Sequence, residues 1–310
     1  MRLACMFPGQ GSQSIGMLKD FEQFKVFSDV FGIAKEVMGI DYWHLAQTGP
    51  VEDLNDTENT QVVMLIADVA LYRYLISTGM PEPVIMAGHS LGEYAALVCA
   101  NSLEFTDALK VVSARARFMK KSAGDEKGAM AAIIGLGNAE VDEICQSIDS
   151  AYHNKALSVA NYNAIGQAVI AGNLELVEEA IVAAEKQGAR MTKILPVSVP
   201  CHCDMMLYAG QQLETVLEQI KFKIPTCKVI SNVNSSAYEN VNNIKELLIK
   251  QVFSPVRWTD TLAVFAANNV DTCIECGPGK VLTGLAKRTI PEVKAIFCSE
   301  LQHIPVWDKQ

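Results

Sequence analysis

The sequence predicts an α/β protein with a parallel sheet, into which a small ferredoxin-like α+β subdomain is inserted. Three observations support this fold class. Short apolar runs alternate with segments of helical periodicity along the chain, as in parallel α/β proteins. One apolar run passes through a sharp glycine turn directly into a helix, at residues 84–98. Between residues 124 and 198, short strands interleave with two helices, which is typical of a βαββαβ module.

We expect two domains from this organisation. Residues 1–123 and 199–310 form the large α/β domain, and residues 124–198 form the small ferredoxin-like subdomain. Residues 122–128 are mostly small or polar, which indicates a linker at the first domain boundary. Its 310 residues, half of them apolar, are enough to bury a large core.

The elements follow from apolar periodicity and from capping residues. In the large domain we expect a strand at residues 3–7, and a helix at 61–77 that the polar residues 57–60 cap and Gly79 ends. After the strand and helix of residues 84–98, we expect a helix at 107–121. In the small subdomain we expect strands at 129–134, 157–161, 167–171 and 191–197, and helices at 139–147 and 174–187. The last third of the chain predicts helices at 206–220, 245–252, 259–268 and 280–288, and strands at 229–232, 272–275 and 293–298.

Composition excludes several classes of function. The formal net charge of −9 argues against a nucleic-acid partner, because phosphate binding needs a basic surface. The apolar stretch at residues 3–7 is too short for a signal peptide, and we expect no membrane span. Nine cysteines, an odd number scattered through apolar segments, suggest small buried residues in a reducing compartment. We therefore expect a cytoplasmic protein with no membrane partner.

Residues 88–92 form a Gly-His-Ser-Leu-Gly sequence, which matches the nucleophile elbow of a hydrolase-like α/β core. Glycines flank the serine because the backbones crowd where a strand turns straight into a helix. This turn would expose Ser90 and aim its hydroxyl at an acyl carbon. The amide of Leu91, at the helix N-terminus, would point toward the developing oxyanion.

A second candidate segment is the loop Pro8-Gly9-Gln10-Gly11-Ser12-Gln13, directly after the first strand. It lacks the third glycine of a dinucleotide fingerprint and the lysine of a P-loop, so nucleotide binding is not expected. Gln10 could instead donate a hydrogen bond to an acyl group or an oxyanion, although a solvated turn residue is an even alternative.

An activated serine needs a base, and His202 is the best candidate among five histidines. It follows a proline bend at the junction of the two predicted domains. Two clusters, Cys201-His202-Cys203 and Cys273-Ile274-Glu275-Cys276, could be metal ligands. A C-x-x-C pair normally closes a turn around zinc, whereas Cys273 and Cys276 lie in and after a predicted strand, so we expect no metal.

Together these segments resemble the malonyl-CoA:acyl carrier protein transacylase family of bacterial fatty-acid synthesis. The resemblance runs in order from the N-terminus to near Arg288. It rests on residues 7–13, 88–94, Arg115 with 118–119, 161–163 with 166–167, 197–200 with His202, Gln251 with 255–258, and Glu275 with 277–282. Cys201, Tyr162 and residues 164–165 depart from the family's usual residues, but none of these changes removes a catalytic group.

The resemblance implies a ping-pong transfer of malonyl from coenzyme A to Ser90, and then to the phosphopantetheine thiol of acyl carrier protein. His202 would act as base and then acid, with the backbone carbonyl around Gln251 orienting its ring. Gln10 and the Leu91 amide would form the oxyanion hole, and His89, Asn161 and Asn163 would contribute to substrate binding. The family assigns Arg115 to specificity, and physics supports this independently, because a guanidinium can hold a free carboxylate by two charge-assisted hydrogen bonds.

The resemblance implies no resident cofactor, and we expect a monomer that binds malonyl-CoA and an acidic carrier protein. Because the chain is itself acidic, docking would need a local basic face. Candidates are Lys120, Lys121, Lys127, Arg190, Lys193, Lys280, Lys287 and Arg288.

Three other functions remain open. A serine hydrolase shares the elbow and base, although no third acidic member can be placed and Arg115 would add little. A discrete acyltransferase or acyl hydrolase of a polyketide pathway shares nearly all the motifs. A carrier-binding module without activity would keep binding when Ser90 is lost.

Overall fold

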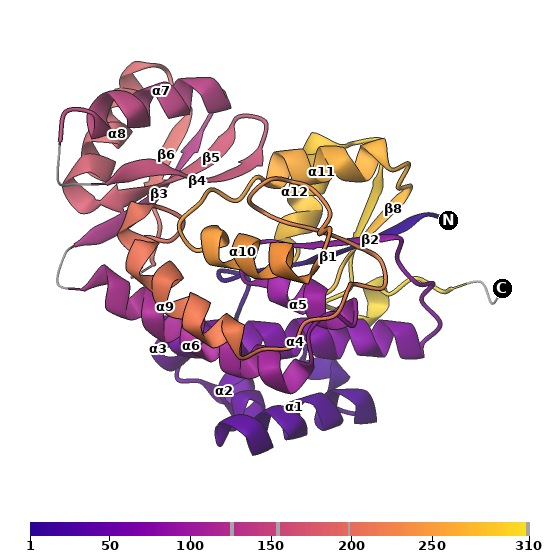
Figure 1. Cartoon of the computed structure of the whole chain (residues 1–310). Coiled ribbons are helices and arrows are strands. Elements are labelled where there is room, and N and C mark those ends of the chain that lie inside the picture. The colour runs from indigo at the N-terminus through magenta and orange to yellow at the C-terminus, as the bar shows by residue number, and fades with distance from the viewer. Residues whose placement is uncertain (125–126, 153–155, 198, 308–310) are drawn as a thin grey trace.

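The protein, described here from a computed structural model over residues 1–124, 127–152, 156–197 and 199–307, contains two separate sheets (Figure 1). The larger sheet has five strands in the order β7-β2-β1-β8-β9, and every neighbouring pair is parallel. Its strands are β1 (Leu3–Phe7), β2 (Ile85–Gly88), β7 (Lys228–Ile230), β8 (Thr272–Glu275) and β9 (Lys294–Phe297). The predicted α/β fold with a parallel sheet is confirmed.

Helices cover both faces of this sheet, as the side chains of β1 demonstrate. Leu3, Cys5 and Phe7 join one core cluster, whereas Ala4 and Met6 join the other, because successive side chains of a strand point to opposite faces. The first face packs against α4 (Thr57–Ser77), α5 (Gly92–Cys99), α6 (Phe105–Ala123), α9 (Leu207–Glu218) and α10 (Val241–Gln251). The second packs against α11 (Trp258–Ala267) and α12 (Val281–Thr289).

The helix α4 lies at the centre of the helices that pack on the first face of the large sheet, in contact with α1 (Lys25–Met38), α5 and α6. It begins at Thr57, four residues earlier than expected, because the Asp56 side chain accepts a hydrogen bond from the Glu58 N–H and caps it. By length and composition alone this helix could cross a membrane. However, 78% of its most apolar stretch is buried inside the protein, as in the core helix of a globular domain.

Three helices lie where the sequence pattern predicted no element: α1 (Lys25–Met38), α2 (Tyr42–Thr48) and α3 (Val51–Asn55). They pack below α4 and extend the first core cluster (Figure 1). The buried side chains of α1 are Phe27, Val30, Phe31 and Ala34, which is the spacing of an amphipathic helix. This segment could therefore have been predicted from its periodicity.

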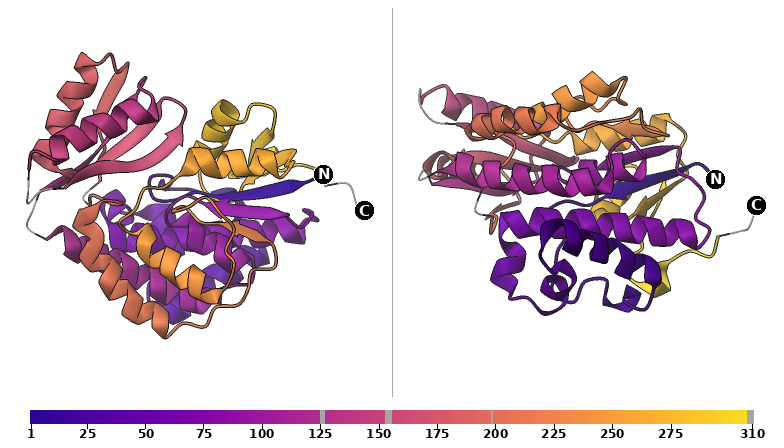
Figure 2. Two further views of the ribbon diagram at one scale, coloured as in Figure 1. Left: turned by 45° about the horizontal axis from the view of Figure 1, so that its top comes forward. Right: turned by 60° about the horizontal axis from the view of Figure 1, so that its bottom comes forward.

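The second sheet is antiparallel, with the strand order β4-β5-β3-β6. Its elements follow one another as β3 (Gly128–Ile134), α7 (Asn138–Asp149), β4 (Leu157–Ala164), β5 (Gln167–Asn173), α8 (Leu174–Lys186) and β6 (Met191–Ile194). Both helices cover one face, away from the large sheet (Figure 2). The other face contributes Met130 and Val169 to a small cluster with Cys203. The domain boundaries stay a prediction, and Ser198 at the second boundary lies outside the described residues.

Candidate active site

The strand β2 passes into α5 through a strained turn at Ser90, whose φ of 51° lies in the left-handed region. A Cβ on Gly88 would lie 1.8 Å from the carbonyl carbon of Gly92, and one on Gly92 would lie 2.1 Å from the carbonyl oxygen of Phe7. Both glycines are therefore required by close backbone approach. The turn places Ser90 at the N-terminus of α5, where the helix dipole favours negative charge.

His202 meets Ser90 from a distant part of the chain. Its Nε2 lies 2.7 Å from Ser90 Oγ, and its Nδ1 lies 2.7 Å from the main-chain oxygen of Gln251. The main-chain N–H of His202 also donates to the main-chain oxygen of Val252, at 3.1 Å. These two acceptors belong to the end of α10, where helix carbonyls lack partners within the helix.

This geometry fixes the role that the imidazole of His202 can play. A carbonyl oxygen can only accept, so Nδ1 carries the hydrogen and Nε2 is left to accept the Ser90 hydroxyl hydrogen. Burial, assisted by the nearby charge of Arg115, lowers the pKa of His202 to about 3. The ring is therefore neutral near pH 7, as a base for serine must be.

Arg115 projects from α6 into the same pocket and is only 2% exposed. Its Nη2 donates to Ser90 Oγ at 3.1 Å and to Gln251 Oε1 at 3.0 Å, and its Nη1 donates to Gln61 Oε1 at 2.6 Å. Its Nε has no hydrogen-bond partner within the described residues. A buried guanidinium held only by neutral oxygens is matched to an anionic ligand.

Gln251 links the other groups of the site. Its main-chain oxygen accepts from His202, its Oε1 accepts from Arg115, and its Nε2 donates to the main-chain oxygen of Ser90 at 2.9 Å. Nε2 also donates to Glu93 Oε2 at 2.7 Å. One fully buried glutamine thus contacts the nucleophile, the candidate base and the cation.

Asn232 fixes the backbone of the elbow. Its Oδ1 accepts from the Ser90 N–H at 2.7 Å, and its Nδ2 donates to the Gly88 oxygen at 2.7 Å. One side-chain amide thus bonds the backbone on both sides of His89, so it stabilises the strained turn that projects Ser90.

Gln10 lies in the loop after β1, which packs against the elbow. A Cβ on Gly9 would fall 2.4 Å from the His89 oxygen and 3.7 Å from the Leu91 nitrogen. The side-chain amide of Gln10 donates to Thr57 Oγ1 at 3.3 Å. In the described part of the chain, the main-chain N–H groups of Gln10 and Leu91 have no hydrogen-bond partner. The main-chain N–H groups of Gln10 and Leu91 are therefore available for an oxyanion, and the Gln10 side-chain amide keeps one N–H that the Thr57 contact does not use.

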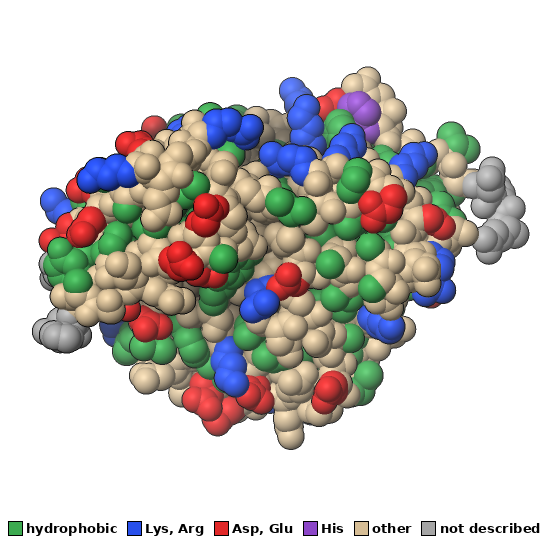
Figure 3. Space-filling view, turned by 90° about the horizontal axis from the view of Figure 1, so that it is seen from above, with side chains coloured by type: hydrophobic (Ala, Val, Ile, Leu, Met, Phe, Trp, Pro, Cys, Tyr) green, Lys and Arg blue, Asp and Glu red, His purple; other side chains and the backbone are tan. Residues whose placement is uncertain are grey.

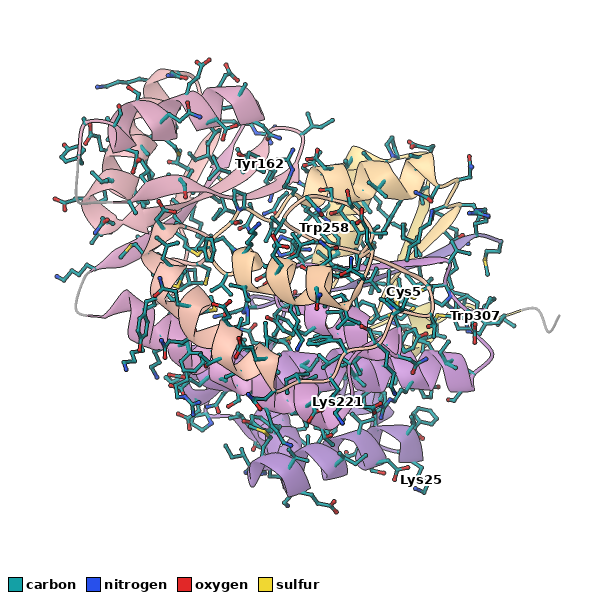
Figure 4. All side chains as sticks on the ribbon, viewed as in Figure 1. Cys5, Lys25, Tyr162, Lys221, Trp258 and Trp307 are labelled. Carbon is teal, nitrogen blue, oxygen red and sulfur yellow. The ribbon has the colours of Figure 1, made fainter. Side chains whose placement is uncertain are left out.

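His89 and Asn163 form a pair at the edge of the site, with His89 Nε2 2.8 Å from Asn163 Oδ1. The His89 ring also packs on Trp258, with ring centroids 5.5 Å apart. Figure 4 shows Trp258 at the start of α11, between the two sheets, with Tyr162 on the neighbouring small sheet. Burial lowers the pKa of His89, so this ring is also neutral near pH 7.

A cavity of about 110 Å³ joins these residues. Asn161 lines it and is 6% exposed, whereas Asn163 reaches it only through His89. Met119, Met130, Leu195 and Val197 supply apolar walls. The full lining is Gln10, Gln61, His89, Ser90, Leu91, Arg115, Met119, Met130, Asn161, Leu195, Val197, Cys201 and His202.

The cysteines around the site do not form a metal centre within the described residues, where no group of three or more His, Cys, Asp or Glu could hold an ion. Cys201 lines the cavity, and burial raises the pKa of its thiol to about 11. The thiol is therefore protonated near pH 7 and does not compete with Ser90 as a nucleophile.

Sequence reasoning missed four polar residues of the site. Gln61, Glu93 and Asn232 are each at most 1% exposed, and Tyr238 donates to Glu93. Gln61 gave a weak signal, because it interrupts an otherwise apolar helix, and Glu93 did so as a charge in an apolar segment. Asn232 and Tyr238 follow β7 in an ordinary polar turn, which carries no such signal.

The strained Ser90 elbow and the neutral His202 on its hydroxyl are the groups that acyl transfer through a serine in an α/β fold needs. The family model of the acyl transferase domain matches residues 5–309. The chain is 43% identical over 300 residues to the malonyl CoA-acyl carrier protein transacylase of Escherichia coli strain K12, covering 96% of each protein.

Two solved structures are closely similar. The malonyl CoA-acyl carrier protein transacylase from Coxiella burnetii superposes with a TM-score of 0.95 at 39% identity, covering 98% of this chain and 96% of that one. A malonyl-transacylase in complex with a holo type II PKS acyl-carrier protein also gives 0.95, at 40% identity and 98% coverage of both chains. The chain belongs to the malonyl CoA-acyl carrier protein transacylase family, and the resemblance that its motifs indicated is confirmed.

Proposed function

We propose that this enzyme transfers a malonyl group from malonyl-CoA through Ser90 to the phosphopantetheine thiol of acyl carrier protein, feeding fatty acid biosynthesis. The observation that carries this proposal is the position of Arg115, whose buried guanidinium lies 3.1 Å from the nucleophile. An acyl chain on Ser90 that ends in a carboxylate would place that charge beside the guanidinium. An uncharged acetyl group would leave it without an anion.

The first half-reaction uses the contact between Ser90 and His202. The Ser90 hydroxyl gives its proton to His202 Nε2 as Oγ attacks the thioester carbon. The main-chain N–H groups of Gln10 and Leu91 stabilise the oxyanion, and the N-terminus of α5 adds its dipole. The carbon–sulfur bond then breaks, and the thiolate of coenzyme A takes the proton from His202.

The second half-reaction reverses these roles. His202 Nε2 accepts the proton of the phosphopantetheine thiol, the sulfur attacks the malonyl ester, and Ser90 leaves with the proton from His202. The carbonyls at the end of α10 stabilise the transient imidazolium and so replace a triad carboxylate. No resident cofactor is needed for either step.

The partner follows from the same chemistry. The carrier protein is acidic, so its docking face should be basic, and basic side chains gather along one edge of the face that Figure 3 shows. Lys280 precedes α12 and follows Gly279, on which a Cβ would lie 3.7 Å from Ser12 in the loop of Gln10. Lys287 and Arg288 are exposed in the last turn of α12. Lys120 is a weaker candidate, because it pairs with Asp56 and Glu58.

We expect the enzyme to be a monomer, because one chain supplies every group of the site. We also expect it to be cytoplasmic, because its cysteine content indicates a reducing compartment.

The likeness to a transacylase in complex with a type II PKS carrier also supports a second candidate, a discrete acyltransferase of a polyketide pathway. Rates with fatty-acid and polyketide carrier proteins would separate these two.

Intact mass measurement tests the proposal directly. Brief exposure to malonyl-CoA should add one malonyl group to the wild type and none to Ser90→Ala, and holo carrier protein should then remove it. Acetyl-CoA should give a weak adduct. Rapid release of free malonate, without an adduct or transfer, would instead indicate a hydrolase.

A further inference from the structure

The carboxylate of Glu93 lies beneath the active site, one layer away from the reacting atoms. It is fully buried, three residues after Ser90 in α5. Its Oε2 accepts from Gln251 Nε2 at 2.7 Å and from the Asn232 N–H at 3.2 Å, and its Oε1 accepts from the Tyr238 hydroxyl. None of the steps described above uses this group.

The contacts of Gln251 show what the carboxylate does. Its Nε2 faces two oxygens, Glu93 Oε2 and the main-chain oxygen of Ser90, while its Oε1 faces the donor Nη2 of Arg115. If the Gln251 amide turned over, its Oε1 would face the oxygens of Glu93 and Ser90, and its NH₂ group would face the guanidinium of Arg115. An ionised carboxylate accepts hydrogen bonds only, so it permits a single amide orientation.

Arg115 depends on that orientation. Two of its neutral acceptors are the side-chain oxygens of Gln61 and Gln251, which hold the guanidinium from opposite helices, α4 and α10. If Gln251 Oε1 turned away, the guanidinium would lose one of these acceptors. It would then be less well placed to receive the carboxylate of an acyl group.

We propose that Glu93, as a carboxylate, is a positioning residue for acyl selectivity: it fixes the Gln251 carboxamide, which in turn holds Arg115 in the acyl pocket. This inference deepens the proposed malonyl transfer and rests on it. Because Gln251 orients His202 through its main chain, Glu93 acts on the selectivity of the reaction more than on the base.

Protonation of Glu93 gives a readout that a purely structural role would lack. Burial raises the pKa of Glu93 to about 7, against the hydrogen bonds from Tyr238, Gln251 and Asn232 and the charge of Arg115. Tyr94 also interacts with it electrostatically. A protonated Glu93 can donate as well as accept, so only the Ser90 oxygen and the Arg115 guanidinium still oppose the turned amide, and Arg115 is held less firmly below neutral pH.

The experiment compares kcat/KM for malonyl-CoA and acetyl-CoA in the wild type, Glu93→Gln, Arg115→Ala and the double variant. Glu93→Gln should lower the malonyl-to-acetyl ratio by at least about tenfold, the scale of one charge-assisted hydrogen bond. In the Arg115→Ala background the same change should have less than about a twofold effect, because residues that act through one another are not additive. Asp68→Asn is the matched control, since Asp68 is another fully buried carboxyl group outside this network, and it should leave the ratio unchanged.

The pH profile supplies a second test that does not depend on whether Glu93→Gln folds. In the wild type the ratio should fall as the pH is lowered from about 8 to about 6, because Glu93 gains its proton while the malonyl carboxylate stays ionised. Tyr238→Phe removes a donor from the carboxylate and should move the midpoint of this change upward.

Two results would overturn the inference: a wild-type ratio that is constant over this pH range, or a Glu93→Gln effect of equal size with and without Arg115. If the wild type forms no malonyl-serine, the proposed function fails instead.

Discussion

Arg115 Nη2 donates a hydrogen bond to Ser90 Oγ at 3.1 Å, so the cation that would select the acyl group touches the nucleophile itself. In the free enzyme, this contact and the one to His202 hold the hydroxyl between a donor and an acceptor. Once Ser90 carries an acyl group, the guanidinium can turn to the carboxylate at its far end. The Ser90 oxygen that would attack the thioester is therefore also the atom that Arg115 contacts in the free enzyme.

Arg115→Ala should lower kcat/KM for malonyl-CoA by about 100-fold or more, because the substrate carboxylate would be buried without its partner. The value for acetyl-CoA should change by less than about tenfold, since acetyl has no charge to lose. Steady-state kinetics with both thioesters measure the difference. Equal losses for the two substrates would show that Arg115 maintains the fold and does not select the acyl group.

His202→Ala and Gln251→Ala should differ in kind, although both residues belong to the candidate site. Loss of the imidazole should reduce kcat about 1,000-fold or more for both thioesters. Gln251→Ala keeps the main-chain oxygen that orients His202, so it should mainly raise KM for malonyl-CoA through Arg115. Stopped-flow acylation and steady-state rates separate these effects, and a kcat loss in Gln251→Ala as deep as in His202→Ala would contradict this division.

The acid limb of the pH profile should lie well below neutrality. Burial and the charge of Arg115 lower the pKa of His202 to about 3, so the neutral base is present at any pH above that value. We expect kcat/KM for acetyl-CoA, which does not need the Arg115 contact, to stay within about twofold from pH 8 to about pH 5. Circular dichroism at each pH controls for unfolding. Loss of activity through a single protonation near pH 6.5, the ordinary range of histidine, would show that burial does not lower the pKa of His202.

Gly88→Ala should destabilise the protein by about 3 kcal/mol or more, because its Cβ would meet the backbone of Gly92 and Glu93, which cannot move aside cheaply. Gly284→Ala is the control, since Gly284 lies in α12 with no heavy atom within 4 Å of the new Cβ. That change should stabilise the protein by up to about 1 kcal/mol. Urea denaturation compares the two, and similar midpoints would mean that the elbow tolerates a side chain.

Reversing Lys287 and Arg288 to Glu should raise KM for holo carrier protein about tenfold at low salt, with little change in KM for malonyl-CoA. Lys25→Glu with Lys221→Glu makes the same change in net charge at two residues that do not line the cavity and that lie in the lower part of the molecule in Figure 4. This control should leave the carrier KM nearly unchanged. An unchanged carrier KM in the α12 variant would place the docking face elsewhere.

Local sequence pattern was enough to predict the nucleophile elbow, the parallel sheet and the family of this protein. The apolar run, the paired glycines and the helical segment at residues 84–98 indicated the elbow, because close backbone approach permits only glycine at residues 88 and 92. The alternation of strands and helices predicted the parallel sheet, and the order of motifs indicated the family. These properties are local, or repeat along the chain, so they can be read without knowing which segments meet.

Only the tertiary structure decided how the groups of the site are connected. Ser90 and His202 are 112 residues apart, and the residue that links them to Arg115 lies at the end of a helix 49 residues further on. The sequence did not reveal that the Gln10 main-chain N–H has no partner in the described part of the chain, or that Glu93 lies beneath Gln251. Hydrogen bonds join atoms across distances of about 3 Å, and the packing of the sheet and its helices, rather than the spacing of residues along the chain, determines which atoms meet.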